Sequence, residues 1–120
     1  MSPEGLGNMS SITTHVLDTA RGRPAAGMRV VLEARTGDGW TAVGGGVTDA
    51  DGRVPGLVAE GALRAGVHRV TFHTGDWFAA EGTEGFYPLV TVDCELGDPE
   101  AHYHVPLLIS PYGYSTYRGS

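Results

Sequence analysis

Short runs of alternating apolar and polar residues make up most of this chain. In residues 28–35 (MRVVLEAR) every even-numbered position is apolar, while Arg29, Glu33 and Arg35 occupy odd-numbered positions. Successive side chains of a β-strand point to opposite faces of a sheet, so this period of two predicts a strand whose even-numbered positions face a core. By the same reasoning, strands are predicted at residues 11–17, 40–48, 68–74, 87–96 and 103–110.

Turn-forming residues separate these runs. Residues 36–39 (TGDG) and 49–52 (DADG) predict tight turns, because glycine and aspartate favour the backbone angles that a chain reversal needs. Pro88, Pro106 and Pro111 predict strand ends or sheet edges, since proline has no N–H to donate to a neighbouring strand. We therefore expect interruptions of the sheets at these positions.

Two further features complete the predicted architecture. The run of three glycines at 44–46 is unusual inside a strand and indicates a bulge or a loosely held edge. One short helix is expected over residues 77–82 (WFAAEG), with Asp76 capping its N-terminus and Glu81 within it. About seven short strands with a single helix predict an all-β fold, in the form of a two-sheet β-sandwich.

Length and composition fit one small acidic domain. The chain has 120 residues, enough for a single hydrophobic core. Residues 1–10 (MSPEGLGNMS) are expected to be a flexible N-terminal extension of a domain at 11–120. The formal net charge of −6 argues against nucleic acid or an anionic membrane surface as a partner. All eight basic residues are arginines, so the chain has no lysine for Schiff-base chemistry or a Walker-type phosphate loop.

Histidines lie on the polar face of two predicted strands. In the last strand the apolar odd-numbered positions of residues 105–109 share one face, and His102 and His104 share the other. His15 likewise lies opposite the even-numbered, core-facing positions of residues 11–17. Because imidazole titrates near neutral pH, histidines on an outer face are candidate acid–base groups.

Metal binding and thiol chemistry receive little support from the sequence. The two histidines of the last strand form only a pair, whereas a zinc site needs three or four ligands. The turn at 49–52 begins like a calcium loop but lacks the later ligands, including the closing glutamate. Cys94, the single cysteine, is either a small buried side chain or a reactive thiol. His68 and His73 have ordinary strand contexts and are assigned no role.

The C-terminal segment is rich in aromatic rings and carries the strongest resemblance to a known family. Residues 102–120 (HYHVPLLISPYGYSTYRGS) hold four of the five tyrosines, whereas a disordered tail normally avoids aromatic residues. Together with residues 12–18 (ITTHVLD), 22–25 (GRPA), 48–53 (TDADGR) and 72–78 (FHTGDWF), this segment resembles the 5-hydroxyisourate hydrolases, the enzymatic branch of the transthyretin-like proteins. The matching motifs follow one another in order along almost the whole chain.

The resemblance implies a fold, an assembly and a reaction. The implied fold is a transthyretin-like β-sandwich of two four-stranded sheets with one short helix. The implied assembly is a homotetramer, a dimer of dimers, with its active sites between the dimers. The implied reaction opens the six-membered ring of 5-hydroxyisourate, the product of urate oxidase, to give 2-oxo-4-hydroxy-4-carboxy-5-ureidoimidazoline. The resemblance implies neither a metal nor an organic cofactor.

Matched positions also imply the site residues. The implied catalytic residues are His15, Arg53, His104 and Ser120, and the implied substrate-binding residues are His15, Arg53, Tyr117, Arg118 and Gly119. Hydrolysis needs a base to activate water and an acid for the leaving nitrogen, and either His15 or His104 can serve in each role. We favour His104, hydrogen-bonded toward Ser120, as the base. Arg53 offers a planar set of donors that suits a flat, polar substrate or a developing oxyanion.

Two alternative functions stay open. A non-enzymatic small-ligand carrier of the same fold would lack the histidine and arginine set and the Tyr-Arg-Gly-Ser ending, which this chain has. A generic adhesion or carbohydrate-binding sandwich would tolerate loss of the C-terminal segment, whereas a hydrolase would not. Because the sequence shows no secretion signal and no Ser-Lys-Leu ending, the cytoplasm is the expected location.

Overall fold

Ten strands and one helix make up the described part of the chain, which covers residues 11–97 and 101–119 of a computed structural model. In chain order they are β1 (Ser11–Thr13), β2 (Val16–Asp18), β3 (Arg23–Pro24), β4 (Arg29–Thr36), β5 (Gly39–Val47), β6 (Gly66–Phe72), α1 (Thr74–Ala80), β7 (Val90–Leu96), β8 (His102–His104), β9 (Leu107–Ser110) and β10 (Gly113–Thr116). Every region predicted to be a strand contains one, but the boundaries are shifted and two of the predicted strands are each divided in two. The short strands β3 and β10 were not predicted.

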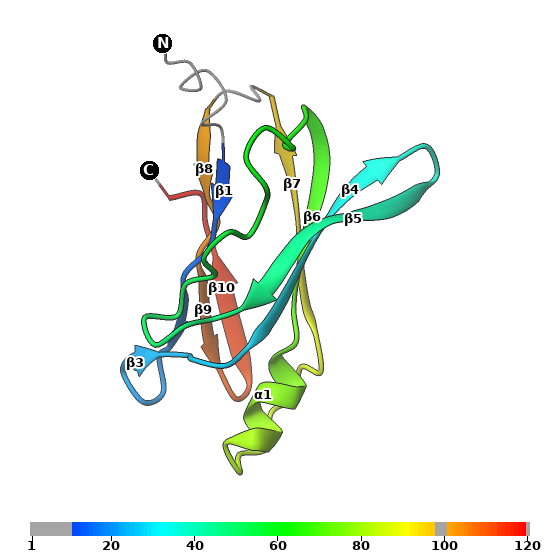
Figure 1. Cartoon of the computed structure of the whole chain (residues 1–120). Helices are drawn as coiled ribbons and strands as arrows, with labels where there is room; N and C mark the ends of the chain where they lie inside the picture. The colour runs from blue at the N-terminus through cyan, green and yellow to red at the C-terminus, as the bar shows by residue number, and fades with distance from the viewer. Residues whose placement is uncertain (1–10, 98–100, 120) are drawn as a thin grey trace.

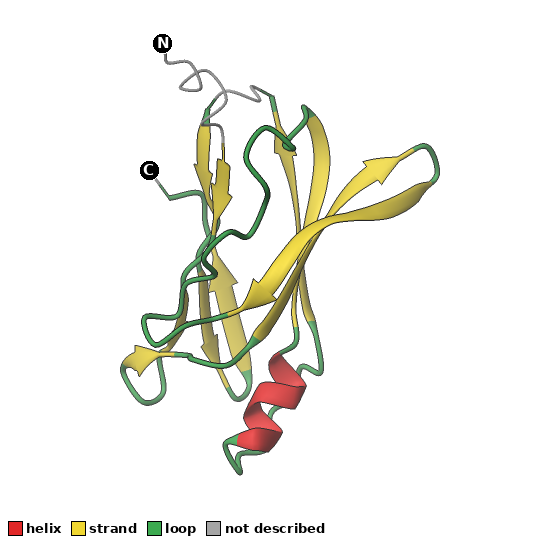
Figure 2. Cartoon of the chain, in the orientation of Figure 1, coloured by secondary structure: helices red, strands yellow, loops and turns green. Residues whose placement is uncertain are grey.

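The strands form two layers that face each other (Figure 1). One four-stranded sheet has the order β10-β9-β2-β3, and the two-stranded pair β1-β8 extends this layer. The second four-stranded sheet has the order β5-β4-β6-β7, and its strands are antiparallel throughout. Helix α1 lies at one end of the second sheet, between β6 and β7 in the chain (Figure 2). The predicted two-sheet sandwich with one short helix is confirmed.

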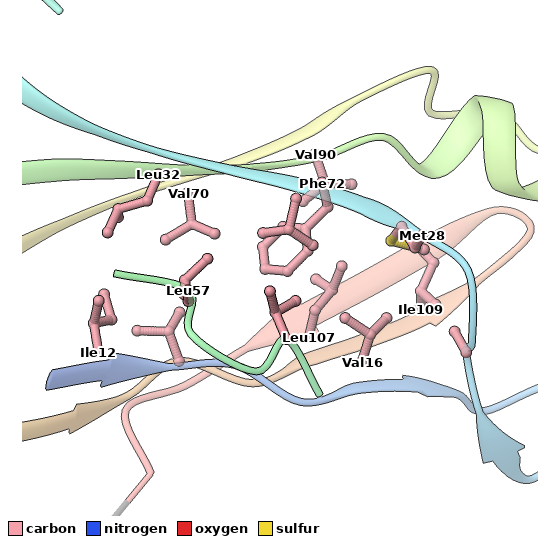
Figure 3. Close-up of a cluster of buried hydrophobic side chains, with 14 of the residues drawn as sticks. Ile12, Val16, Met28, Leu32, Leu57, Val70, Phe72, Val90, Leu107 and Ile109 are labelled. Atoms are coloured by element: carbon pink, nitrogen blue, oxygen red, sulfur yellow. The ribbon is translucent and has the colours of Figure 1, made fainter. Parts of the chain in front are cut away.

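The hydrophobic core fills the space between the two layers (Figure 3). Val70 and Phe72 of β6 face Val16 of β2 and Leu107 of β9, and all four side chains are fully buried. Leu57, from the loop after β5, enters the same core. Truncating a buried leucine such as Leu107 to alanine typically costs about 2–5 kcal/mol of stability. The core-facing positions are those that the period of two predicts.

Helix α1 begins earlier than the sequence analysis predicts. Asp76 was expected to be the N-cap, but it lies in the first turn of a helix that starts at Thr74. The hydroxyl of the buried Thr74 donates a hydrogen bond to the carbonyl oxygen of Tyr87 at 2.7 Å, which anchors the start of the helix. His73 precedes the helix and makes no side-chain capping hydrogen bond, and Glu81 is the C-cap. The burial and hydrogen bond of Thr74, rather than a side-chain cap, therefore determine where the helix starts.

The predicted strand at 103–110 is in fact two strands, β8 and β9. Pro106 lies between them, as expected for a residue that cannot donate to a ladder. The predicted strand at 11–17 is divided in the same way between β1 and β2. The hydroxyl of Thr14, in that gap, donates to the carbonyl oxygen of Val105 at 2.7 Å, so the two interruptions lie side by side.

The predicted irregularity of residues 44–46 is confirmed. Strand β5 is an edge strand, and its register with β4 shifts between Leu32 and Glu33, so that Val43 is the extra, bulged residue. The loop after β5 passes close to the glycines. A Cβ atom on Gly44 would lie 2.0 Å from the carbonyl oxygen of Leu57, so the close approach of this loop requires glycine.

Some sequence predictions concern residues outside the described ranges. The flexible extension predicted for residues 1–10 lies there, as does Ser120, so the domain boundary and the role of Ser120 stay predictions. Within the described ranges, no helix is both long and apolar enough to span a membrane.

Candidate active site

Segments far apart in the sequence meet around His104. Strand β1 pairs with β8 in parallel, which sets Thr13 opposite His104 (Figure 1). On the other side of β8, the backbone N–H of Gly119 donates to the carbonyl oxygen of His104 at 2.8 Å. His15 forms an isolated antiparallel bridge with Arg53. The fold thus brings together His15, Arg53 and His104, which the sequence analysis selected, and adds the C-terminal tail.

The turn at 49–52 holds Arg53 next to His15. The turn forms as predicted, because the side chain of Asp49 accepts the backbone N–H of Arg53 at 3.0 Å. The carbonyl oxygen of Gly52 accepts the N–H of Val16 at 2.8 Å, which joins the turn to the strand layer. Gly52 has a φ of +80°, and a Cβ atom there would lie 2.3 Å from the carbonyl oxygen of Val16. Only glycine fits at position 52, because any side chain there would clash with the backbone of β2. The close approach of the turn to β2 places Arg53 opposite His15.

The ring of His104 is held on both flanks. Its Nδ1 atom lies 2.8 Å from the hydroxyl oxygen of Thr13. A Cβ atom on Gly119 would lie 2.6 Å from Cδ2 of the ring, so Gly119 lies directly against that edge. Because Nδ1 and Cδ2 are the two ring atoms next to Cγ, both contacts lie near the backbone. The distal edge of the ring, which contains Nε2, points away from them.

Burial and neighbouring charge favour the neutral form of His104. Burial lowers the pKa of His104 below its ordinary value of 6.5, and the positive charge of Arg53 lowers it further. Charge on His15 and His102 acts in the same direction, whereas a hydrogen bond to the backbone of Thr13 acts in the opposite direction. Within the described ranges, no carboxylate forms an ion pair with Arg53, His15 or His104. A neutral imidazole is the form that accepts a proton from water.

The side chains of Tyr117 and Arg118 in the tail both line a pocket next to Tyr103. The guanidinium of Arg118 lies 4.9 Å from the ring centroid of Tyr103, a buried residue on the opposite face of β8 from His104. Tyr117 is 58% exposed. Ser120, predicted as a hydrogen-bond partner of His104, lies outside the described residues.

A pocket between β7 and the tail contains none of the histidines. Its volume is about 230 Å³, and Cys94, Tyr103, Tyr117 and Arg118 are among the residues that line it. Burial, and then the charge of Asp93, raises the pKa of Cys94, which favours the unreactive thiol. Cys94 is only partly buried, but its raised pKa argues against the second alternative, a reactive thiol. We assign the candidate site to the outer face at His104, where Arg53 and His15 lie close enough to act electrostatically on its ring.

Two residues of interest were missed from the sequence. Thr13 contacts the ring of His104, and the available signal was its position on the same outer face as His15. His68 was assigned no role, yet it is only 1% exposed and its Nδ1 lies 3.1 Å from the carbonyl oxygen of Gly66, a structural role inside β6. Among the described residues, no group of three or more His, Cys, Asp or Glu side chains is arranged to hold a metal ion.

Known proteins are similar to this chain in sequence and in fold. The model of the HIUase/Transthyretin family matches residues 12–119. The chain is 50% identical to a 5-hydroxyisourate hydrolase of Deinococcus radiodurans, over 91% of this chain and 95% of that protein. Its fold is similar to the solved structure of Klebsiella pneumoniae 5-hydroxyisourate hydrolase, with a TM-score of 0.81 and 39% identity over 92% of this chain and 100% of that one. It is also similar to transthyretin from Sparus aurata, with a TM-score of 0.85 and 33% identity over 90% and 95% of the two chains.

Proposed function

The chain belongs to the HIUase/Transthyretin family, and on that premise we propose that it is a hydrolase that opens the ring of 5-hydroxyisourate. The observation that carries the proposal is the meeting of His15, Arg53 and His104, in which the other two residues act electrostatically on His104. The 5-hydroxyisourate hydrolases to which the chain is similar support the same activity.

His104 is the proposed general base. In its neutral form it accepts a proton from a water molecule, whose oxygen then attacks a ring carbonyl of the substrate. The ring C–N bond breaks, and a proton passes to the leaving nitrogen, so the overall step consumes water and no other reactant. Positioned proton transfer of this kind typically contributes about 10²–10⁴-fold to the rate. His15 is the proposed partner that polarises or protonates the substrate.

Arg53 is proposed to bind the substrate and to stabilise the oxyanion that forms on the attacked carbonyl. Its side chain is exposed and makes no ion pair with a described carboxylate, so its donors are open to a ligand. One such donor typically contributes about 3–4 kcal/mol to the transition state. Arg53 also lowers the pKa of His104, which keeps the base in its active form.

The tail is proposed to complete the site. Gly119 lies against the ring of His104, and the exposed side chain of Tyr117, two residues earlier in the sequence, is proposed to bind substrate through its hydroxyl. Arg118 contacts Tyr103, so we propose that it supports substrate binding by shaping the tail. The pairing of Ser120 with His104 remains a prediction.

We also propose that the chain assembles as a homotetramer, a dimer of dimers with the active sites between the dimers. The open outer face at His104 and the exposed aromatic side chains of Phe86, Tyr112 and Tyr114 support an assembly that covers them. Light scattering should give four times the mass of one chain, and a fully active monomer would contradict the assembly. The cytoplasm also remains a proposed location, to be tested by cell fractionation.

The proposed activity can be tested with freshly generated substrate. Urate oxidase makes 5-hydroxyisourate in situ, and its decay is followed by ultraviolet absorbance with and without this protein. We expect the protein to accelerate the decay in proportion to its concentration. Similarity to transthyretin favours a second candidate, a small-ligand carrier, which predicts saturable ligand binding with no accelerated decay.

A further inference from the structure

Thr13 presents its hydroxyl to His104 from the neighbouring strand. The two residues are opposite each other in the parallel pair β1-β8, and Oγ1 of Thr13 lies 2.8 Å from Nδ1 of His104. We propose that Thr13 is a positioning residue that holds His104 as the tautomer protonated on Nδ1, which leaves Nε2 free to accept a proton. The consequence for catalysis rests on the proposed hydrolase function, but the tautomer can be observed without it.

The contact between Thr13 and His104 can be made in two ways with opposite consequences. If the threonine hydroxyl donates to Nδ1, the proton of the neutral ring is on Nε2, and this atom cannot act as a base. If Nδ1–H donates to the hydroxyl oxygen, Nε2 carries the lone pair and can take a proton from water. The direction of one hydrogen bond therefore decides which role His104 can have.

The surroundings of Thr13 favour donation by Nδ1–H. The threonine hydroxyl has another acceptor for its own proton, the carbonyl oxygen of Tyr103 at 3.5 Å, and Nε2 of His102 lies 3.4 Å away. Both contacts are long, but the carbonyl oxygen of Tyr103 can only accept, so it offers the hydroxyl proton a direction other than the ring of His104.

Gly119 and Thr13 lie on opposite edges of the His104 ring. Gly119 lies against the Cδ2 edge, while Thr13 contacts the Nδ1 edge. A half-turn of the ring of His104 would exchange the two edges and leave the threonine hydroxyl facing a carbon atom. The hydrogen bond of Thr13 thus fixes both the orientation of the ring and the nitrogen that faces outward.

The nitrogen atoms of His104 can be examined directly in the full chain. Long-range proton–nitrogen correlation spectra of the ¹⁵N-labelled protein, recorded above the pKa of His104 and assigned with His104→Asn, distinguish a protonated from an unprotonated Nε2. Three variants accompany the wild type: Thr13→Val removes the hydroxyl at nearly constant shape, and Thr13→Ser retains it. Thr41→Val is the matched control, because it removes a hydroxyl that bonds to Thr36 at 2.8 Å in an exposed hairpin.

We expect an unprotonated Nε2 in the wild type, in Thr13→Ser and in Thr41→Val, and a mixed or reversed tautomer in Thr13→Val. In the decay assay, Thr13→Val should lower kcat by ~10- to 100-fold with little change in KM, because the base is misdirected while substrate binding is retained. Thr13→Ser should restore most of the rate, and Thr41→Val should match the wild type.

Two results would overturn the proposal. One is a wild-type ring protonated on Nε2, and the other is a Thr13→Val protein with the wild-type tautomer and rate. If Thr13→Val does not fold, the wild-type spectrum and Thr13→Ser still decide. A wild-type protein without hydrolase activity would contradict the proposed function alone, since the spectrum reports the tautomer independently of turnover.

Discussion

Each layer of the sandwich carries an arginine on its outer surface. Arg69 is paired with a carboxylate, whereas Arg53 has no described carboxylate partner. On the β5-β4-β6-β7 sheet, the guanidinium of Arg69 donates to both carboxylate oxygens of Asp93, at 2.7 and 3.1 Å, and stacks 4.1 Å from the ring centroid of Trp40. On the other layer, Arg53 lies close enough to His104 to lower its pKa, and no described carboxylate pairs with either residue.

This difference indicates that the Arg69–Asp93 pair is a structural cluster, whereas the residues around His104 form the candidate catalytic cluster. The hydrogen bond from Arg69 lowers the pKa of Asp93, so each charge of that exposed pair satisfies the other. An exposed pair of this kind contributes little to stability and offers no free group to a ligand. Around His104, burial and then like charges disfavour the protonated ring, which lowers stability only in acidic solution, where an ordinary histidine takes up a proton. Groups perturbed in this way are expected where they serve catalysis.

The largest effect is expected from the base itself. His104→Ala removes the proposed proton acceptor, so the rate of 5-hydroxyisourate decay catalysed by the protein should fall by about 10²–10⁴-fold. His73→Ala is the control, because His73 makes no side-chain capping hydrogen bond at the start of α1. Rates close to wild type in His104→Ala would remove this residue from the mechanism.

The next effect is expected from the arginine beside it. Arg53→Gln keeps a polar side chain but removes the charge and the planar fork, so kcat/KM should fall by about 10²–10³-fold. The free energy of unfolding should not decrease, since no described ion pair is lost. Denaturant titration checks the second point, and a strongly destabilised variant would mean that Arg53 is structural.

A smaller effect is expected from the tail. In Gly119→Ala the new methyl group would lie 2.6 Å from Cδ2 of His104, so the ring or the tail must move. Displacement of about 1 Å can reduce a rate ~100-fold, and we expect a loss of ~10- to 100-fold in kcat. Gly39→Ala is the matched control, because a Cβ atom there has no neighbour within 4 Å. Equal activity in both variants would show that Gly119 does not position His104.

The smallest effect is expected on the opposite layer. Arg69→Gln breaks the pair with Asp93 and the contact with Trp40, yet it lies far from the proposed chemistry in the other sheet. We expect wild-type kcat/KM and a melting temperature close to that of the wild type, because exposed ion pairs contribute little. A loss of activity comparable to that of Arg53→Gln would contradict the distinction between the two surfaces.

Much of the fold follows from the alternation of residues. The period of two places Val70 and Phe72 inside, and His15 and His104 outside, as observed. The capping preference of aspartate does not predict the start of α1 correctly, because the helix begins at the buried Thr74 and Asp76 lies in its first turn. The alternation of apolar and polar residues describes one strand at a time. It therefore does not predict contacts that depend on packing between segments.

The site residues came from resemblance to a family, and their geometry required the fold. The contact of Thr13 with His104 joins residues 91 positions apart and depends on the register of β1 with β8. No local pattern specifies the register between two three-residue strands. His68 was assigned no role, although it has the same even-numbered parity as the core-facing Val70 and Phe72, and its side chain is buried.

The most direct test of the account is the pH dependence of kcat/KM for the wild type and Arg53→Gln. The pKa of His104 is lowered by burial and by Arg53, so the neutral base should persist below pH 6.5, and the wild-type rate should fall only in more acidic solution. Removing the positive charge should raise this pKa, which moves the acid limb of the variant to higher pH. A limb that stays in place, or moves to lower pH, would contradict the claim that Arg53 maintains His104 as a neutral base.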